Sequence, residues 1–416
     1  MKVAGIIAEY NPFHNGHQYH IEETKTQTGA DYVIAVMSGD FVQRGAPAFL
    51  DKYERTRAAL SGGCDLVLEL PVVYSTASAE FFASGAVHLL NRLGICDFLS
   101  FGSEEGSLNI LSRFADILAN EPKEYQQLLR EQLKSGHSFP SAREHALSEY
   151  LNKYMDDVTT SDNSGFLKGS NNILAMEYLK ALRGTASNMK PATILRKNAS
   201  YHDIELNGPI ASASAVRHHI LEHRDISKVS DVVANQTLHS LIEMSKQNYA
   251  FPDFDHLTPY LHSAMLSGRN PEQYLDWDKD LSNRFRQLSW PTLSFTETAD
   301  QLKSRNITHS RIHRALFHFI LGIEKDRFQS QYERNPIPYG RILGFRKESS
   351  HLIKEINQRG SIPLITKPAS IHNHLKEEDS WMWEMDLNAS RLYQSILFGN
   401  FGHRLPSAYE RTPVIV

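Results

Sequence analysis

Short apolar runs alternate with longer amphipathic segments through the first half of the chain. The apolar runs lie at residues 3–8, 32–37, 65–70, 98–101 and 193–196. The segments of helical length between them include residues 17–28, 51–60, 78–93 and 170–182. Short, nearly uncharged runs are typical of strands that are buried on both faces of a parallel sheet. Their alternation with helices predicts an α/β fold of Rossmann-like architecture.

The pattern changes further along the chain. Residues 108–154 have the spacing of two or three helices, which predicts a helical insertion at about 106–155. From about residue 235 the alternation fades, and helical segments follow at residues 236–249, 256–268, 271–288, 296–304 and 312–321. A candidate strand lies at 362–365. We therefore expect an α/β domain of residues 1–230 and a mainly helical C-terminal domain of residues 231–416.

The turn after the first strand is the strongest candidate for chemistry. Asn11 and Pro12 end the strand, because proline disfavours helix at the residue before it. A helix that begins near His17 then aims its backbone N–H groups and the positive end of its dipole at one spot, where an anion can bind. His14 and His17 add side-chain donors for phosphate oxygens, and Gly16 leaves room for a nucleotide beside the backbone.

Two other interpretations of these histidines are open. They are compatible with ordinary surface residues in a loop, since an isolated HxxH pattern is common. A zinc site formed by His14, His17 and His20 is the other interpretation, but the sequence offers no fourth ligand nearby. We therefore expect no protein-bound metal at this turn.

Further polar residues follow the ends of the other predicted strands. The loop at 38–47 carries Asp40 and Arg44 at the carboxyl end of the second strand, where open α/β sheets bind ligands. Gly102 follows the fourth strand, and Arg196 lies at the end of the fifth. A helix that begins near Ser212 would place serine hydroxyls and Arg217 toward the same anion. The alternative for each is an ordinary solvated turn or helix cap.

Composition narrows the class of protein. The 416 residues are 41% hydrophobic and 22% charged, as in a globular protein, and no apolar stretch reaches the length of a membrane span. The two cysteines, Cys64 and Cys96, form no disulfide framework, which favours a reducing cytoplasm. A net charge of −4 argues against binding nucleic acid by bulk electrostatics, so any RNA site is expected to be local.

Two groups of basic residues in the second half are candidates for such an RNA site. The first group is Lys303, Arg305, Arg311 and Arg314, with two histidines beside them. The second is Arg341, Arg346, Lys347 and Arg359, with Tyr339 and Phe345 interleaved. Basic and aromatic side chains together suit a folded RNA, while ordinary solvated helix faces are the alternative.

Several stretches carry a resemblance to a known family. They are GIIAEYNPFHNGHQYH at 5–20, SGDFVQRGAPA at 38–48, DLVLELP at 65–71, FGSE at 101–104, NNILAMEYLKAL at 171–182 and RKNASYHD at 196–203. In this order they resemble the tRNA(Met) cytidine acetate ligase family, over about residues 1–220. The HxGH motif is shared by a nucleotidyltransferase superfamily, whereas GDFVQRG followed by the leucine-rich strand is far more specific.

The resemblance implies an enzyme that activates acetate with ATP as acetyl-adenylate and acetylates N4 of the wobble cytidine of elongator tRNA(Met). It implies a HUP-type nucleotidyltransferase domain at 1–230 and a tRNA-binding C-terminal domain. ATP is then a substrate, with Mg²⁺ expected beside it. Acetate and elongator tRNA(Met) are the expected partners, in the cytoplasm and without a membrane.

The resemblance also implies the site residues. Its ATP-binding segment matches Ile7, Ala8, Glu9, Tyr10, Asn11, Pro12, Phe13, His14, Asn15, Gly16, His17, Gln18, Tyr19 and His20, and Gly102, Asn171, Arg196, Ser214 and Arg217 would complete the nucleotide site. His14 and His17 would act on the phosphates as catalytic residues. Arg44 is the third catalytic candidate, because its loop would orient acetate or the cytidine base. Ser214 and Arg217 lie in the stretch ASASAVR, which departs from the usual ISSTxxR motif of the superfamily.

Two further functions stay open as alternatives. One is an adenylyltransferase that acts on a small phosphorylated metabolite, although such enzymes are usually compact. The other is a non-catalytic protein that binds nucleotide and RNA. Consumption of ATP in the presence of acetate and tRNA separates these functions.

Overall fold

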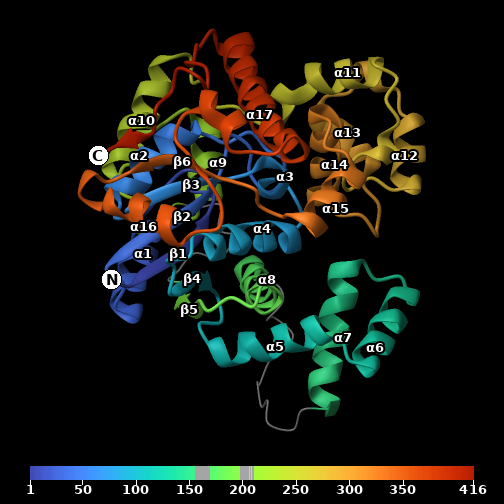
Figure 1. Cartoon of the computed structure of the whole chain (residues 1–416). Coiled ribbons are helices and arrows are strands. Elements are labelled where there is room, and N and C mark those ends of the chain that lie inside the picture. The colour runs from blue at the N-terminus through green and yellow to red at the C-terminus, as the bar shows by residue number, and fades with distance from the viewer. Residues whose placement is uncertain (155–168, 197–205, 207, 209) are drawn as a thin grey trace.

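The computed structural model describes residues 1–154, 169–196, 206, 208 and 210–416 (Figure 1). Its strands form one mixed sheet in the order β5-β4-β1-β2-β3-β6-β7, and β8 pairs with β6. The strands are β1 (Val3–Ala8), β2 (Tyr32–Ser38), β3 (Leu66–Leu70), β4 (Phe98–Ser103), β5 (Lys190–Leu195), β6 (Gly340–Phe345), β7 (Leu364–Ile365) and β8 (Val414–Ile415). The five strands from the first half of the chain are mutually parallel, which confirms the expected α/β fold.

The order of the strands fixes where a ligand can bind. The chain runs from β1 to β2 and β3 on one side, and then returns to place β4 and β5 on the other side of β1. The side of β1 on which successive strands are added therefore changes, and the switch point lies between β1 and β4. In open α/β sheets, ligands bind outside the carboxyl ends of the strands at such a switch point. The HxGH turn follows β1 directly at this place.

Helices cover both faces of the parallel strands. They are α1 (Asn15–Thr28), α2 (Lys52–Ser61), α3 (Val72–Ser75), α4 (Ala79–Arg92), α8 (Ser170–Gly184) and α9 (Ala213–His223). The expected insertion forms α5 (Leu108–Asn120), α6 (Lys123–Lys134) and α7 (Phe139–Tyr154). Figure 1 shows these three helices projecting from the sheet below α8, against which α5 packs.

The second half of the chain is mainly helical, as expected. Its longer helices are α10 (Asn235–Lys246), α11 (Thr258–Leu266), α12 (Lys279–Arg286), α13 (Phe295–Leu302), α14 (His309–Leu321), α15 (Lys325–Arg334), α16 (His351–Arg359) and α17 (Glu377–Phe401). Short 3₁₀ helices lie at Ser227–Val229, Phe254–Leu257, Pro271–Gln273, Trp290–Thr292, Lys347–Ser349 and Pro368–Asn373. A separate domain at 231–416 stays a prediction.

The sequence did not reveal that the second half also extends the sheet. β6 pairs antiparallel with β3, with Leu66 opposite Phe345, and β7 and β8 continue from β6. Arg341 lies on β6 and is only 3% exposed, since its Nη1 is 3.0 Å from Glu69 Oε2. The prediction that Arg341 belongs to an exposed basic face is therefore wrong. A buried carboxylate on the neighbouring strand makes this arginine compatible with a central strand.

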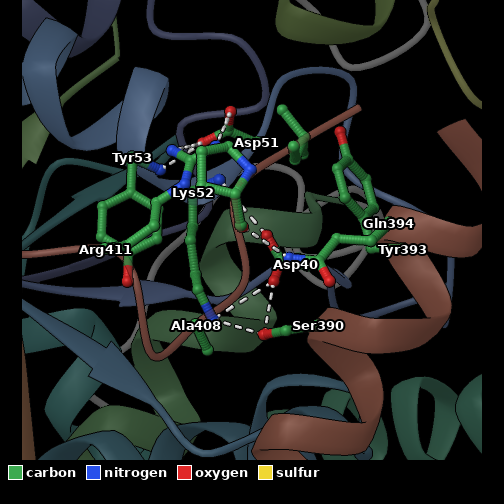
Figure 2. Close-up of a pocket in the computed structure, with 11 residues that line it drawn as sticks. Asp40, Asp51, Lys52, Tyr53, Ser390, Tyr393, Gln394, Ala408 and Arg411 are labelled. Carbon is green, nitrogen blue, oxygen red and sulfur yellow. Dashed lines mark hydrogen bonds and ion pairs between the residues drawn. The ribbon is translucent and has the colours of Figure 1, made fainter. Parts of the chain in front are cut away.

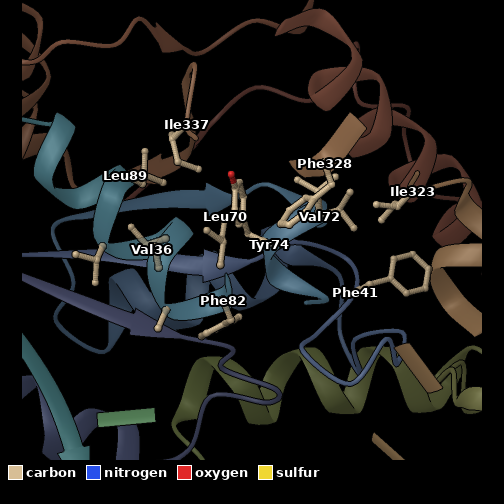
Figure 3. Close-up of a cluster of buried hydrophobic side chains, with 14 of the residues drawn as sticks. Val36, Phe41, Leu70, Val72, Tyr74, Phe82, Leu89, Ile323, Phe328 and Ile337 are labelled. Atoms are coloured by element: carbon tan, nitrogen blue, oxygen red, sulfur yellow. The ribbon is translucent and has the colours of Figure 1, made fainter. Parts of the chain in front are cut away.

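A hydrophobic cluster joins the two halves of the chain (Figure 3). It combines side chains from the sheet, from α3 and α4, and from the C-terminal helices: Val36, Leu70, Val72, Tyr74, Phe82, Leu89, Ile323, Phe328 and Ile337. Each fully buried aliphatic or aromatic side chain contributes about 1.5–3 kcal/mol relative to exposure. Phe41 extends the cluster, because its ring lies 4.5 Å from that of Phe317 on α14. This contact fixes the loop after β2 against the helical region.

Candidate functional site

The HxGH turn is held by a capping box at the start of α1. His14 is the N-cap residue, and its Nδ1 accepts a hydrogen bond from the backbone N–H of Gly16 at 3.0 Å. Nδ1 of His17 accepts from the backbone N–H of His14 at 3.2 Å. The two rings stack with their centroids 3.7 Å apart. Two histidines thus occupy the roles that serine or threonine and glutamate usually take at a helix start.

These backbone bonds determine which ring nitrogen carries the proton. An imidazole nitrogen that accepts a hydrogen bond has no proton, so the neutral ring carries its proton on the other nitrogen. Both His14 and His17 accept through Nδ1. Each ring is therefore a donor through Nε2, which is the arrangement needed to hydrogen-bond an anionic oxygen.

The surroundings keep the histidines neutral. Burial, then the charges of Arg196 and Arg217, lower the pKa of His14 to about 3. Burial and the neighbouring His14, Arg196 and His20 hold the pKa of His17 well below its usual value. His20 has its pKa lowered to about 4, mainly by burial and then by Arg196. At pH 7 these side chains are therefore uncharged, and His14 and His17 can act only as neutral hydrogen-bond donors.

Gly16 is required by the packing of the turn itself. A Cβ placed on Gly16 would lie 2.9 Å from Cε1 of His14 and 3.0 Å from its Nδ1. Any larger residue would therefore push the His14 ring away from its backbone bond. The sequence suggested that a glycine is needed here to leave room for a nucleotide. The structure gives a second reason, which is that the His14 ring occupies the space a side chain would take.

Arginines surround the turn without carboxylate ion pairs in the described part of the chain. Arg217 is on α9; its Nη1 donates to the carbonyl of Asn11 and its Nη2 to Ser214 Oγ at 3.2 Å. Arg196 follows β5, and its buried Nε has no hydrogen-bond partner among the described residues. The structure thus gathers Arg196, Ser214 and Arg217 around the histidines, as the sequence predicted for a phosphate site. Their contact with nucleotide stays a prediction.

Gly102 and Asn171 lie at the other side of the switch point. A Cβ on Gly102 would be 3.4 Å from Cγ of Arg196, so this glycine lies directly beside the Arg196 side chain. Nδ2 of Asn171 donates to Glu104 Oε1 at 2.7 Å, and Glu104 Oε2 accepts from the backbone N–H of Asn172 at 2.8 Å. Glu104 therefore fixes the start of α8 beside β4. The FGSE motif at 101–104 contains Glu104, but nothing in the sequence pattern indicated this role.

The rest of the segment at 7–20 packs against distant parts of the chain. Asn11 Oδ1 accepts from the backbone N–H of Phe49 at 2.7 Å. Asn15 donates through its side chain to the carbonyl of Asp231 at 2.8 Å. His20 Nε2 lies 3.2 Å from Ser100 Oγ on β4, so this ring is already engaged with the neighbouring strand. In the described residues no group of three or more histidine, cysteine or acidic side chains is placed to hold a metal.

The loop after β2 places its two charged residues differently. Arg44 is exposed, and its charge reaches both Arg217 and His313. Burial and then His309, together with Arg44, lower the pKa of His313 to about 4. Glu9 holds this loop to the turn, because its Oε1 accepts from the backbone N–H of Gln43 at 3.0 Å. Arg44 thus lies between the nucleotide site and α14.

Asp40, the other charged residue of this loop, is buried below it (Figure 2). Its Oδ2 is 3.2 Å from Nζ of Lys52 and accepts from Ser390 Oγ at 2.9 Å. Nζ of Lys52 also contacts Glu69 Oε1 at 2.7 Å. Asp40, Lys52 and Ser390 line a small pocket of about 270 Å³, counting its open mouth, beside α17. Asp40 therefore anchors the loop, whereas Arg44 is exposed on it.

Two of the four residues in the first basic group, Arg311 and Arg314 on α14, are paired with aspartates. Arg314 Nε is 2.9 Å from Asp276 Oδ2, and Arg311 Nη2 is 2.7 Å from Asp278 Oδ2. Arg346 and Arg359 of the second group also lie within ion-pair distance of glutamates. Counting basic residues therefore overstated the positive charge at these four arginines. The partners of Arg311 and Arg314 lie more than 30 positions earlier in the chain, whereas those of Arg346 and Arg359 are near neighbours in sequence.

The parallel sheet, its switch point and the HxGH turn define a nucleotidyltransferase. The HIGH Nucleotidyl Transferase family model matches residues 1–405. The tRNA(Met) cytidine acetate ligase of Thermoanaerobacter sp. (strain X514) is 42% identical over 396 residues, covering 94% of this chain and 95% of that protein. The ligase of the same name from Clostridium acetobutylicum is 41% identical over 399 residues, covering 95% and 96%.

Solved structures agree with these relatives. The crystal structure of Thermotoga maritima TmcAL bound with alpha-thio ATP has a TM-score of 0.87 and 31% identity, and the match covers 100% of both chains. The apo form of the same protein has a TM-score of 0.88. The chain belongs to the tRNA(Met) cytidine acetate ligase family of HIGH nucleotidyl transferases. The described part of the chain contains no helix long and apolar enough to cross a membrane.

Proposed function

We propose that this protein is an ATP-dependent ligase that acetylates N4 of the wobble cytidine of elongator tRNA(Met). The observation that supports it best is the HxGH turn, in which two neutral histidines present Nε2–H donors. Arg196 and Arg217 lie beside them and form no carboxylate ion pair with the residues that the structure describes. Relatives named for this reaction match nearly the whole chain. The protein is expected to act in the cytoplasm.

The first step joins acetate to ATP. A carboxylate oxygen of acetate attacks the α-phosphorus, the bond from that phosphorus to the bridging oxygen breaks, and pyrophosphate leaves as acetyl-adenylate forms. Little proton transfer is needed, so positioning and charge stabilisation supply most of the rate. His14 and His17 would donate to phosphate oxygens as negative charge grows on them. Arg196, Ser214 and Arg217 would hold the departing phosphates.

The second step transfers the acetyl group. The N4 amine of the cytidine attacks the acetyl carbonyl carbon, the bond to the adenylate oxygen breaks, and AMP leaves while the amine loses a proton. The amine is a poor nucleophile, so the base must be held outside its stack against the mixed anhydride. The exposed Arg44, between the nucleotide site and α14, is the candidate for orienting acetate or this base.

Mg²⁺ is expected to accompany ATP. With no cluster of three metal-binding side chains among the described residues, the ion would be held mainly by the phosphates and water, as Mg²⁺ often is. The charge it supplies would help neutralise the pyrophosphate that leaves. The tRNA is expected to contact the helical region, although Arg311 and Arg314 are already engaged with aspartates.

The test is ATP–pyrophosphate exchange with acetate, formate and propionate in turn, with and without bulk tRNA. Acetate-dependent exchange that His17→Ala abolishes is the expected result. A dinucleotide product would instead indicate a metabolite adenylyltransferase. ATP binding without exchange under every condition would indicate a non-catalytic nucleotide- and RNA-binding protein.

Arg44 is tested separately with Arg44→Ala. A loss of acetate activation would assign it to acetate, and a loss of tRNA acetylation with normal exchange would assign it to the base. Wild-type rates in both assays would remove Arg44 from the mechanism. Arg57→Ala is a suitable control, because Arg57 lies on the exposed face of α2 and pairs with Glu54.

A further inference from the structure

Arg55 is a fully buried arginine on α2 that binds only backbone carbonyls among its hydrogen-bond partners in the described chain. Its Nε donates to Leu50 O at 2.9 Å. Its Nη1 donates to Glu9 O at 2.7 Å and to Ser38 O at 2.9 Å, and its Nη2 donates to Gly39 O. These carbonyls belong to the ends of β1 and β2 and to the residues before α2.

Packing alone does not explain a buried guanidinium at position 55. Burial lowers the pKa of Arg55, while the charges of Asp40, Asp51 and Glu9 act against that change from a distance. Within the described chain none of these carboxylates forms an ion pair with it. An apolar side chain of similar size would avoid the cost of desolvating a cation. The guanidinium offers instead a rigid fork of donors that can hold several carbonyls at fixed positions.

The guanidinium of Arg55 lies at the point where β1 and β2 separate. The paired register of the two strands ends at Ala8 and Met37. The next residue on each strand is Glu9 and Ser38, and Nη1 of Arg55 bridges their carbonyls. Arg55 therefore sets the spacing of the two strand ends at the entrance to the HxGH turn.

A second arginine holds the other side of the same turn. Arg217 donates to Asn11 O, so Arg55 and Arg217 hold the carbonyls on either side of Tyr10. Tyr10 has a positive φ of 48°, which a residue other than glycine adopts only when its surroundings impose it. Its ring contacts that of His17, with centroids 4.9 Å apart. A shift of the Glu9 carbonyl would rotate Tyr10 and displace His17.

We propose that Arg55 is a positioning residue for adenylate formation, which acts by fixing the carbonyl of Glu9 and thereby the ring of His17. The inference rests on the proposed function for its kinetic effect. It assigns no contact between Arg55 and substrate. Arg55 works through the backbone of the turn.

The test compares Arg55→Lys and Arg55→Gln with the wild-type protein in acetate-dependent ATP–pyrophosphate exchange. Lysine keeps the charge but cannot serve four carbonyls, and glutamine keeps one pair of donors without charge. We expect kcat to fall by about 10–100-fold while KM for ATP stays within about threefold. Assays run below the melting midpoint of each variant, with near-UV circular dichroism to measure the folded fraction. Arg57→Lys on the same helix is the matched control and should behave as wild type.

A double-mutant cycle with Arg217→Lys tests the shared action on Tyr10. Two arginines that fix one peptide turn should give strongly non-additive losses, whereas independent sites add. Imidazole ¹⁵N shifts of His17 give a readout that needs no activity, and we expect them to move in Arg55→Lys. If the wild-type protein shows no exchange, the proposed function fails, and these shifts still test the positioning.

The inference is overturned if Arg55→Lys and Arg55→Gln keep the wild-type kcat per folded molecule, or if the losses match the unfolded fraction alone. It is also overturned if His17 shifts stay unchanged in both folded variants. Losses of kcat that are additive in the double-mutant cycle would show that Arg55 and Arg217 do not act together through Tyr10, which contradicts the proposed route from Glu9 to His17.

Discussion

The arginines around the HxGH turn differ from those of the helical region in what they face. Arg55, Arg196 and Arg217 form no carboxylate ion pair in the described chain, and two of them bind backbone carbonyls. Arg311 and Arg314 on α14 are instead held by Asp278 and Asp276. The first group keeps its positive potential for a bound anion, whereas the charge of the second group is already balanced within the fold.

This difference teaches that charge density along a sequence is a poor measure of charge available to a ligand. Arg311 and Arg314 lie in a stretch that is dense in basic residues, yet their aspartate partners come from a preceding segment of the chain. The arginines near the turn are scattered over more than 160 positions, and the fold gathers them where anionic phosphates would lie. Salt dependence and substitution should therefore affect the two groups in different ways.

The largest expected effect comes from His17. His17→Ala removes a neutral Nε2–H donor from the turn and should reduce acetate-dependent ATP–pyrophosphate exchange by about 10²–10³-fold. The free energy of unfolding should change far less, which chemical denaturation would measure. His88→Ala is the control, because this histidine lies on α4 away from the turn. Exchange within a factor of three of wild type would exclude His17 from the chemistry.

Arg196 should have the next largest effect. Arg196→Met removes a cation that has no carboxylate ion pair within residues 1–154, 169–196 and 210–416, and a lost charged hydrogen bond to phosphate corresponds to about a 10–100-fold increase in KM for ATP. Stability should hardly fall, because burying this charge carries a desolvation cost. Arg183→Met serves as the control, since Arg183 pairs with Asp116 at 2.8 Å on the insertion side. An unchanged KM would place the phosphates elsewhere.

Arg314 should show the opposite behaviour. Arg314→Met leaves the carboxylate of Asp276 without its main partner and should lower the free energy of unfolding by about 2 kcal/mol, less than for a fully buried pair. Exchange kinetics should stay normal. Arg311→Met, at a more exposed pair, should cost less than about 1 kcal/mol. A variant that is fully stable but impaired in tRNA acetylation would show that Arg314 serves the RNA and not the fold.

A separate prediction concerns the pH dependence of stability. His14 has a folded-state pKa of about 3 and His20 of about 4, both below the unfolded value of 6.5. Below pH 6.5 the unfolded chain binds protons that the folded chain does not. Stability should therefore fall as pH decreases from about 6.5 to about 4, by up to about 1.4 kcal/mol per pH unit for each histidine.

Denaturation at several pH values would measure this slope, and His20→Gln should make it shallower. The kcat of exchange should show no histidine titration between pH 6 and 8, because the rings are neutral throughout. A rate that changes with an apparent pKa near 6.5 would mean that the turn opens to solvent before chemistry.

Much of the fold could be predicted because local patterns specify it. The apolar runs at 3–8 and 32–37 became β1 and β2, and the proline after β1 placed the turn before α1. The second half was harder to predict. β6 has a short sequence with Arg341 inside it, and only its pairing with β3 and with Glu69 makes it a strand.

The sequence by itself determined the α/β class, the anion-binding turn and the residues that resemble a ligase family, because strand length, proline and helix-start signals act over a few neighbouring residues. Only the tertiary structure decided which charges pair. It turned Asp40 toward Lys52, paired Arg314 with Asp276 and placed Arg55 on the carbonyls of two strand ends. These partners are distant in sequence, and burial makes their interactions strong only after the chain has folded.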